Sequence, residues 1–65
     1  MKHLIFYRTN DVFLAEERLK TANVDVEVVP TPVQDKAYCG VCVRIKDEET
    51  ERAITVLESM EFNVV

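Results

Sequence analysis

The side chains that could take part in chemistry are few, and a cysteine is the strongest candidate among them. Cys39 is followed directly by Gly40, the only glycine in the chain. A glycine at such a junction often marks a backbone with positive φ or the close approach of another group. Either would leave the Cys39 thiol uncrowded on one side. The alternative is that Cys39 is a small buried residue at the start of a strand.

A second cysteine completes a C-x-x-C motif, which is the spacing of redox pairs and of half a zinc site. Cys42 stands in a stretch typical of a strand, where residues three apart point to opposite faces. Redox motifs of this spacing normally open a helix, and two sulfurs are too few for a closed zinc site. We therefore expect no metal site within one chain. Cys42 stays a second candidate thiol, and metal binding by Cys39 and Cys42 across a dimer stays a third-ranked hypothesis.

The remaining titratable residues do not form a catalytic set. His3 is the only histidine, and a solvent-exposed position at a strand edge explains it more simply than a role in catalysis. The glutamates of the two predicted helices lie on exposed faces or in first turns, which is typical of solvated charge. A chain with one glycine cannot form a glycine-rich phosphate loop. We expect neither an enzyme nor a cofactor.

Charge and length exclude further classes. The 65 residues include 12 acidic and 8 basic side chains, which gives a formal net charge of −4. This charge argues against binding to nucleic acid or to an anionic membrane surface. The apolar run near the N-terminus is too short for a signal peptide or a membrane span, so we expect a cytoplasmic protein. In that reducing compartment both cysteines should be free thiols.

Hydrophobic spacing predicts six elements that would position Cys39. They are a strand at 4–7, a helix from 9–11 to Asn23, a strand at 24–28, a strand at 41–46, a helix from 47–49 to Met60, and a strand at 62–65. A loop at 31–38 separates the second and third strands. The order βαββαβ predicts one α+β domain over residues 1–65, a ferredoxin-like sandwich with an antiparallel sheet and two helices on one face.

Right-handed crossovers place the third strand between the first and second, and the first strand between the third and fourth. The inward residues of the second and third strands should be Val26, Val28, Val41, Val43 and Ile45. For the first strand the sequence does not decide which alternate residues point inward. Leu4 and Phe6 are one apolar pair, and Ile5 and Tyr7 are the other. Apolar residues on both sides suggest that the open sheet face is partly covered, and a homodimer would cover it.

This topology brings the start of the third strand beside the start of the first helix. Cys39 should therefore lie near Arg8, Thr9 and Asn10. A helix N-terminus and a nearby cation both favour the thiolate, which is the nucleophilic form of sulfur. Tyr38 could line a pocket beside the thiol, although packing explains it more simply.

The stretch Val29-Pro30-Thr31-Pro32, a short polar loop and then Cys39-Gly40-Val41-Cys42 resembles the putative selenium/sulfur (Se/S) carrier protein-like family. The turn Thr9-Asn10-Asp11 and the helix after it are similar as well. The resemblance implies a single Se/S carrier-like domain that is not an enzyme. It implies that the Cys39 sulfur holds sulfur or selenium as a persulfide or selenosulfide. It also implies partners among sulfur-transfer proteins or cysteine desulfurases.

A second hypothesis comes from the fold class alone. Ferredoxin-like domains also serve as ligand-binding or regulatory modules, and such a module would dimerise through its open sheet face. In that case the replacement of Cys39 by alanine would leave the function intact.

Overall fold

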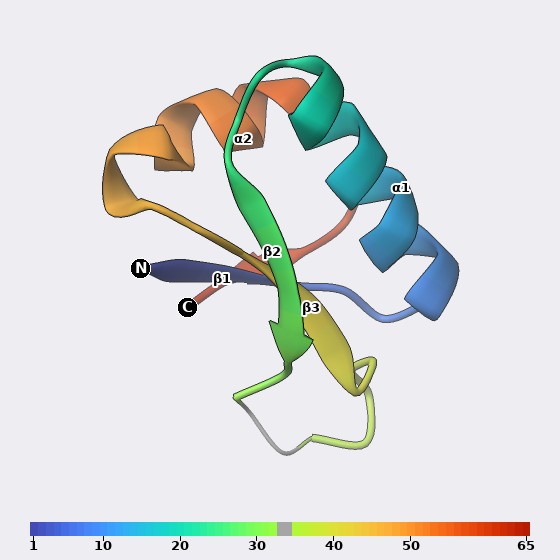
Figure 1. Cartoon of the computed structure of the whole chain (residues 1–65). Helices are drawn as coiled ribbons and strands as arrows, with labels where there is room; N and C mark the ends of the chain where they lie inside the picture. The colour runs from blue at the N-terminus through green and yellow to red at the C-terminus, as the bar shows by residue number, and fades with distance from the viewer. Residues whose placement is uncertain (33–34) are drawn as a thin grey trace.

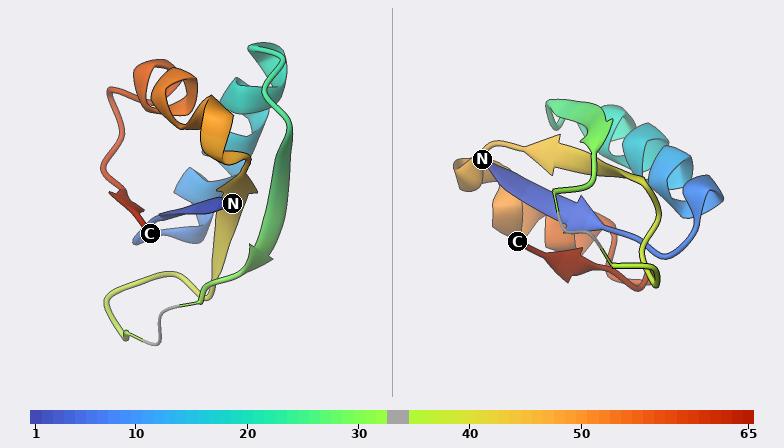
Figure 2. Two further views of the ribbon diagram at one scale, coloured as in Figure 1. Left: turned by 90° about the vertical axis from the view of Figure 1, so that its left-hand side faces the viewer. Right: turned by 90° about the horizontal axis from the view of Figure 1, so that it is seen from below.

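The chain folds in the order β1-α1-β2-β3-α2-β4 in the computed structural model, which describes residues 1–32 and 35–65. The elements are β1 (Lys2–Ile5), α1 (Thr9–Thr21), β2 (Val26–Pro30), β3 (Val41–Ile45), a 3-10 turn η1 (Asp47–Glu49), α2 (Thr50–Val56) and β4 (Asn63–Val64). The four strands form an antiparallel sheet in the order β2-β3-β1-β4. Both helices cover one face of this sheet (Figures 1 and 2). The predicted ferredoxin-like α+β fold and strand order are confirmed.

The core lies between the helices and the sheet. Its members show which alternate residues of β1 face the helices. Leu4 and Phe6 are fully buried within this cluster. Val43 and Ile45 of β3 join them, and the predicted inward valines of β2 pack against the cluster as partly buried residues. Strand alternation then turns the intervening residues of β1 toward the opposite face.

That opposite face is covered over Ile5 by the chain itself. Ile5 and Cys42 are fully buried, yet neither belongs to the core cluster on the helix side. The segment 35–38 lies on the side of the sheet away from the helices (Figures 1 and 2). The predicted cover is therefore supplied within one chain, and Ile5 no longer provides a reason to expect the homodimer.

Several boundaries differ from the predicted ones for local reasons. β1 begins at Lys2, and β2 continues to Pro30, which an edge strand tolerates because a missing donor there faces away from the sheet. α2 ends at Val56, so Met60 lies beyond it. Asn23 has a φ of 63°, which confirms the predicted left-handed end of the first helix. The predicted loop includes Val33 and Gln34, which lie outside the described residues.

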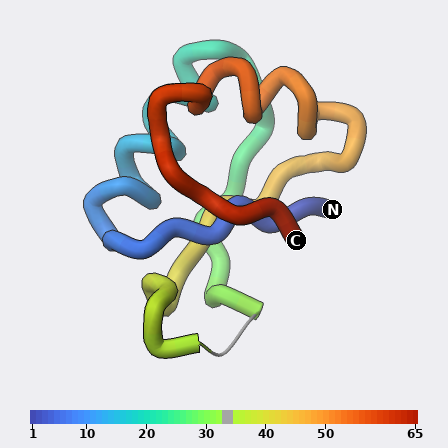
Figure 3. Tube along the Cα trace, turned by 180° about the vertical axis from the view of Figure 1, so that it is seen from behind, coloured from blue at the N-terminus to red at the C-terminus, as the bar shows by residue number. Residues whose placement is uncertain are grey.

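The two ends of the chain meet at one edge of the sheet. The amide of His3 donates to the carbonyl of Val65 at 2.8 Å, and the amide of Val65 donates back to His3 at 2.9 Å. Figure 3 shows the two termini side by side. In the described residues, the helices are too short and too polar to cross a membrane.

Candidate thiol site

Two backbone hydrogen bonds and one from a side-chain hydroxyl position Cys39 just before β3. Its amide donates to the carbonyl of Phe6 at 2.8 Å, which extends the β1–β3 contact beyond the strands. The Thr31 hydroxyl donates to the Cys39 carbonyl at 2.7 Å, and the Thr31 amide donates to the Gly40 carbonyl at 3.0 Å. The backbone of Cys39 is therefore fixed from both β1 and the end of β2.

The Cys39 sulfur lies at the start of α1, as the sequence predicted. Its Sγ is 3.2 Å from Oγ1 of Thr9, the first residue of that helix. The side chain is half-buried and packs against the core cluster. A thiolate can only accept a hydrogen bond, so the Thr9 hydroxyl would donate to the charged form.

The other two predicted neighbours do not contact the sulfur. Arg8 and Asn10 form no side-chain hydrogen bond to Cys39 within residues 1–32 and 35–65. Arg8 lines a cavity between α1 and the segment before β4. Among the described residues, the hydrogen-bond partner of the Cys39 sulfur is therefore Thr9 at the start of α1, and not the Arg8 guanidinium.

Both reasons predicted for a glycine at position 40, a positive φ and the close approach of another group, are wrong. Gly40 does not have a positive φ, and a Cβ built on it would meet no atom of the described chain within 4 Å. A side chain at position 40 would therefore enter open space. Because the backbone there is available to any L-residue, we expect Gly40→Ala to leave the fold intact.

We expect Gly40→Ala to raise the free energy of unfolding by about 0.4–1 kcal/mol, since alanine restricts the unfolded chain more than glycine does. Urea denaturation followed by circular dichroism would measure this change. A decrease in the free energy of unfolding by more than about 1 kcal/mol would show that the fold itself needs the open space at Gly40.

Tyr38 anchors its segment to β4. Its ring stacks on Tyr7 with the centroids 5.3 Å apart, and its hydroxyl accepts a hydrogen bond from Asn63 Nδ2 at 2.6 Å. Asn63 is the cross-strand neighbour of Ile5, so Tyr38 reaches across the open face toward that buried residue. Sequence reasoning missed Asn63, because the local pattern of a two-residue strand carries no sign of a contact 25 positions away.

Cys42 differs from Cys39 in burial and orientation. It is fully buried on the face of the sheet opposite the core cluster, and its Sγ lies 3.9 Å from the carbonyl of Pro30. Burial raises the pKa of the Cys42 thiol, and the nearby Thr31 side chain and Arg44 do not offset this effect. Cys42 is therefore a protonated, inaccessible thiol at neutral pH.

The two cysteines are free and do not act as a local pair. Cys39 packs toward the helix side of the sheet and Cys42 points away from it. Among the described residues, no group of three or more His, Cys, Asp or Glu side chains could hold a metal ion. Metal binding across a dimer stays a prediction that requires a partner chain.

Comparisons with known proteins bear on this site. The family model described as "Putative Se/S carrier protein-like" matches residues 3–64, which include α1, the Cys39-Gly40 junction and all of β3. The searches of curated proteins and of solved structures returned no significant match. The match spans nearly the whole chain and agrees with the resemblance carried by Cys39 and Gly40, so the chain belongs to the putative Se/S carrier protein-like family.

Proposed function

We propose that this protein carries sulfur or selenium on Cys39 as a persulfide or a selenosulfide, without catalysing the reactions on either side of the transfer. One observation carries the proposal. The Cys39 side chain is half-buried, and its sulfur lies at the N-terminus of α1, 3.2 Å from the Thr9 hydroxyl. The second thiol is buried and has a raised pKa. The chain thus offers one thiol for transfer.

The transfer needs no external oxidant. The Cys39 thiol loses its proton to solvent, and the thiolate attacks the terminal sulfur of a persulfide on a donor cysteine. A sulfur–sulfur bond forms at Cys39 while the sulfur–sulfur bond of the donor breaks, and the electron pair leaves with the donor thiolate. Selenium in the terminal position would follow the same exchange. Release to an acceptor thiolate is the reverse step.

The surroundings of the sulfur suit both forms of the carrier. The persulfide is an anion at neutral pH, so the Thr9 hydroxyl and the helix N-terminus would stabilise its negative charge. A donor must bring its persulfide to the exposed side of Cys39, whose side chain is half-buried. A cysteine desulfurase or another sulfur-transfer protein is the kind of partner that this chemistry requires.

Incubation with a cysteine desulfurase and cysteine, followed by intact mass measurement, tests the proposal. We expect the wild-type protein to gain the mass of one sulfur atom and to lose it on treatment with a reducing agent. The Cys39→Ser variant should gain none, while Cys42→Ala should gain as much as the wild type. Equal gain by wild type and Cys39→Ser, or no gain by the wild type, would reject Cys39 as the carrier.

A further inference from the structure

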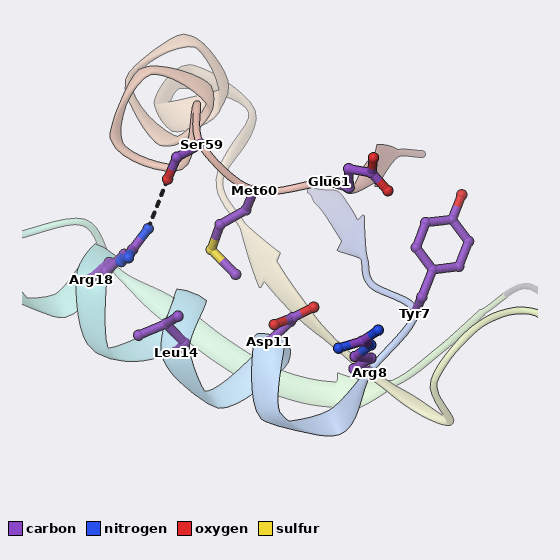
Figure 4. Close-up of a pocket in the computed structure, with 8 residues that line it drawn as sticks. All are labelled: Tyr7, Arg8, Asp11, Leu14, Arg18, Ser59, Met60 and Glu61. Carbon is purple, nitrogen blue, oxygen red and sulfur yellow. Dashed lines mark hydrogen bonds between the residues drawn. The ribbon is translucent and has the colours of Figure 1, made fainter.

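A second site lies along α1, apart from the thiol. A cavity of about 520 Å³ opens between one face of this helix and residues 59–61, and Figure 4 shows the side chains that line it. Its volume falls within the range of small-molecule sites, roughly 300–1,000 Å³. Cys39 does not line it, so the proposed carrier chemistry leaves this cavity without a role.

Charged groups of both signs line the cavity, and none of them is paired. They are Arg8, Asp11, Arg18 and Glu61. The ion pairs among the described residues all involve other side chains, and the two residues outside the description, Val33 and Gln34, carry no charge. Charges that are gathered in a concavity but left unpaired are available to a ligand that carries complementary charges.

The charges are ordered along the cavity. Arg18 lies at one end, where its guanidinium donates to the Ser59 hydroxyl at 3.1 Å (Figure 4). Asp11, Arg8 and Glu61 lie toward the other end, and the apolar side chains of Leu14 and Met60 lie between the two ends (Figure 4).

The spacing of these residues follows from the helix. Positions 8, 11, 14 and 18 are three or four residues apart, so they share one face of α1 and its N-cap. Ten residues of helix separate the two arginine backbones by about 15 Å. An extended tripeptide spans about 10 Å, and the long arginine side chains can lean inward to meet its ends.

Simple ions do not fit this pattern. A phosphate or another small anion would meet the Asp11 and Glu61 carboxylates, and a simple cation would meet the two guanidiniums. A free amino acid matches the end with mixed charge but is too short to reach Arg18. A ligand with an α-amino acid group at one end, a neutral middle and a carboxylate at the other end matches all three parts.

We propose that this cavity binds a short γ-glutamyl peptide. Asp11 and Glu61 would accept hydrogen bonds from the α-ammonium, Arg8 would bind the adjacent carboxylate, and Arg18, oriented by Ser59, would bind the distant carboxylate. Leu14 and Met60 would contact the central side chain. This proposal is independent of the chemistry at Cys39.

Binding of S-methylglutathione, whose blocked sulfur cannot exchange with Cys39, tests this assignment by isothermal titration calorimetry and NMR chemical-shift mapping. We expect saturable binding, with shifts at α1 and at residues 59–61. Arg18→Gln and Asp11→Asn should each weaken binding by about tenfold, since each removes one charge-assisted hydrogen bond at a partly exposed site. Lys20→Gln removes an exposed cation of the same helix outside the cavity and should bind like the wild type.

Three outcomes would overturn the proposal. They are no saturable binding by the wild type, unchanged affinity in Arg18→Gln, and equal affinity for free glutamate, which lacks the distant group. Cys39→Ser, which lacks the proposed carrier thiol, should bind S-methylglutathione like the wild type, because Cys39 does not line the cavity. Peptide binding therefore tests the cavity, and sulfur uptake at Cys39 tests the carrier proposal, so either proposal can fail without the other.

Discussion

In the folded protein, Cys39 should react with an alkylating reagent far faster than Cys42. Cys39 is half-buried, whereas Cys42 is fully buried, and burial raises the pKa of the Cys42 thiol. Cys42 can react only when the sheet opens locally, and an opening that costs about 3 kcal/mol lowers its rate by about 100-fold. Because a raised pKa keeps Cys42 protonated to higher pH, the difference should persist past the ordinary thiol range, near about 8.5.

Two variants with a single cysteine measure the two rates separately. Cys42→Ala reports Cys39 alone, and Cys39→Ser reports Cys42 alone, each followed by mass spectrometry after timed exposure to iodoacetamide. In denaturant the two variants should react at similar rates, which would confirm that the fold causes the difference. Comparable rates in the folded state would contradict the structural distinction between the thiols and would leave the C-x-x-C spacing to be reconsidered.

The placement of the thiol could be predicted because it depends on topology. The hydrophobic periods predict the order βαββαβ, and crossover handedness then puts the start of β3 beside the start of α1. This argument needs no side-chain detail, and the 3.2 Å contact between Cys39 and Thr9 agrees with it. Arg8 could not be placed in the same way, because its long side chain can turn to either side of the helix start.

The contacts of the open sheet face could not be predicted from the sequence pattern. The alternation in β1 leaves Ile5 on the face away from the helices, and the pattern alone cannot say what covers it. The cover depends on segment 35–38 returning across the sheet, where Tyr38 reaches Asn63. The paired charges of Glu27 and Arg44 share that face, so it is more polar than a dimer interface built on Ile5 would require.

The second large effect is expected from Phe6, which links the core to the thiol site. Its side chain is fully buried, and the centroids of the Phe6 and Phe62 rings are 5.5 Å apart. The Phe6 carbonyl accepts the hydrogen bond from the Cys39 amide. Phe6→Ala should lower the free energy of unfolding by about 3–5 kcal/mol. A domain of this size has a total stability of about 3–10 kcal/mol, so much of the population would unfold.

Phe13→Ala is the matched control, since Phe13 lies on α1 with 51% of its surface exposed. That variant should stay within about 0.5 kcal/mol of the wild type in urea denaturation. Because the Cys39 amide is bonded to the Phe6 carbonyl, loss of the Phe6 side chain should loosen the thiol site, and the folded fraction of Phe6→Ala should take up less sulfur than the wild type. A folded Phe6→Ala protein that still takes up sulfur normally would show that the thiol site is held by Thr31 and Thr9 alone, independently of the core beneath it.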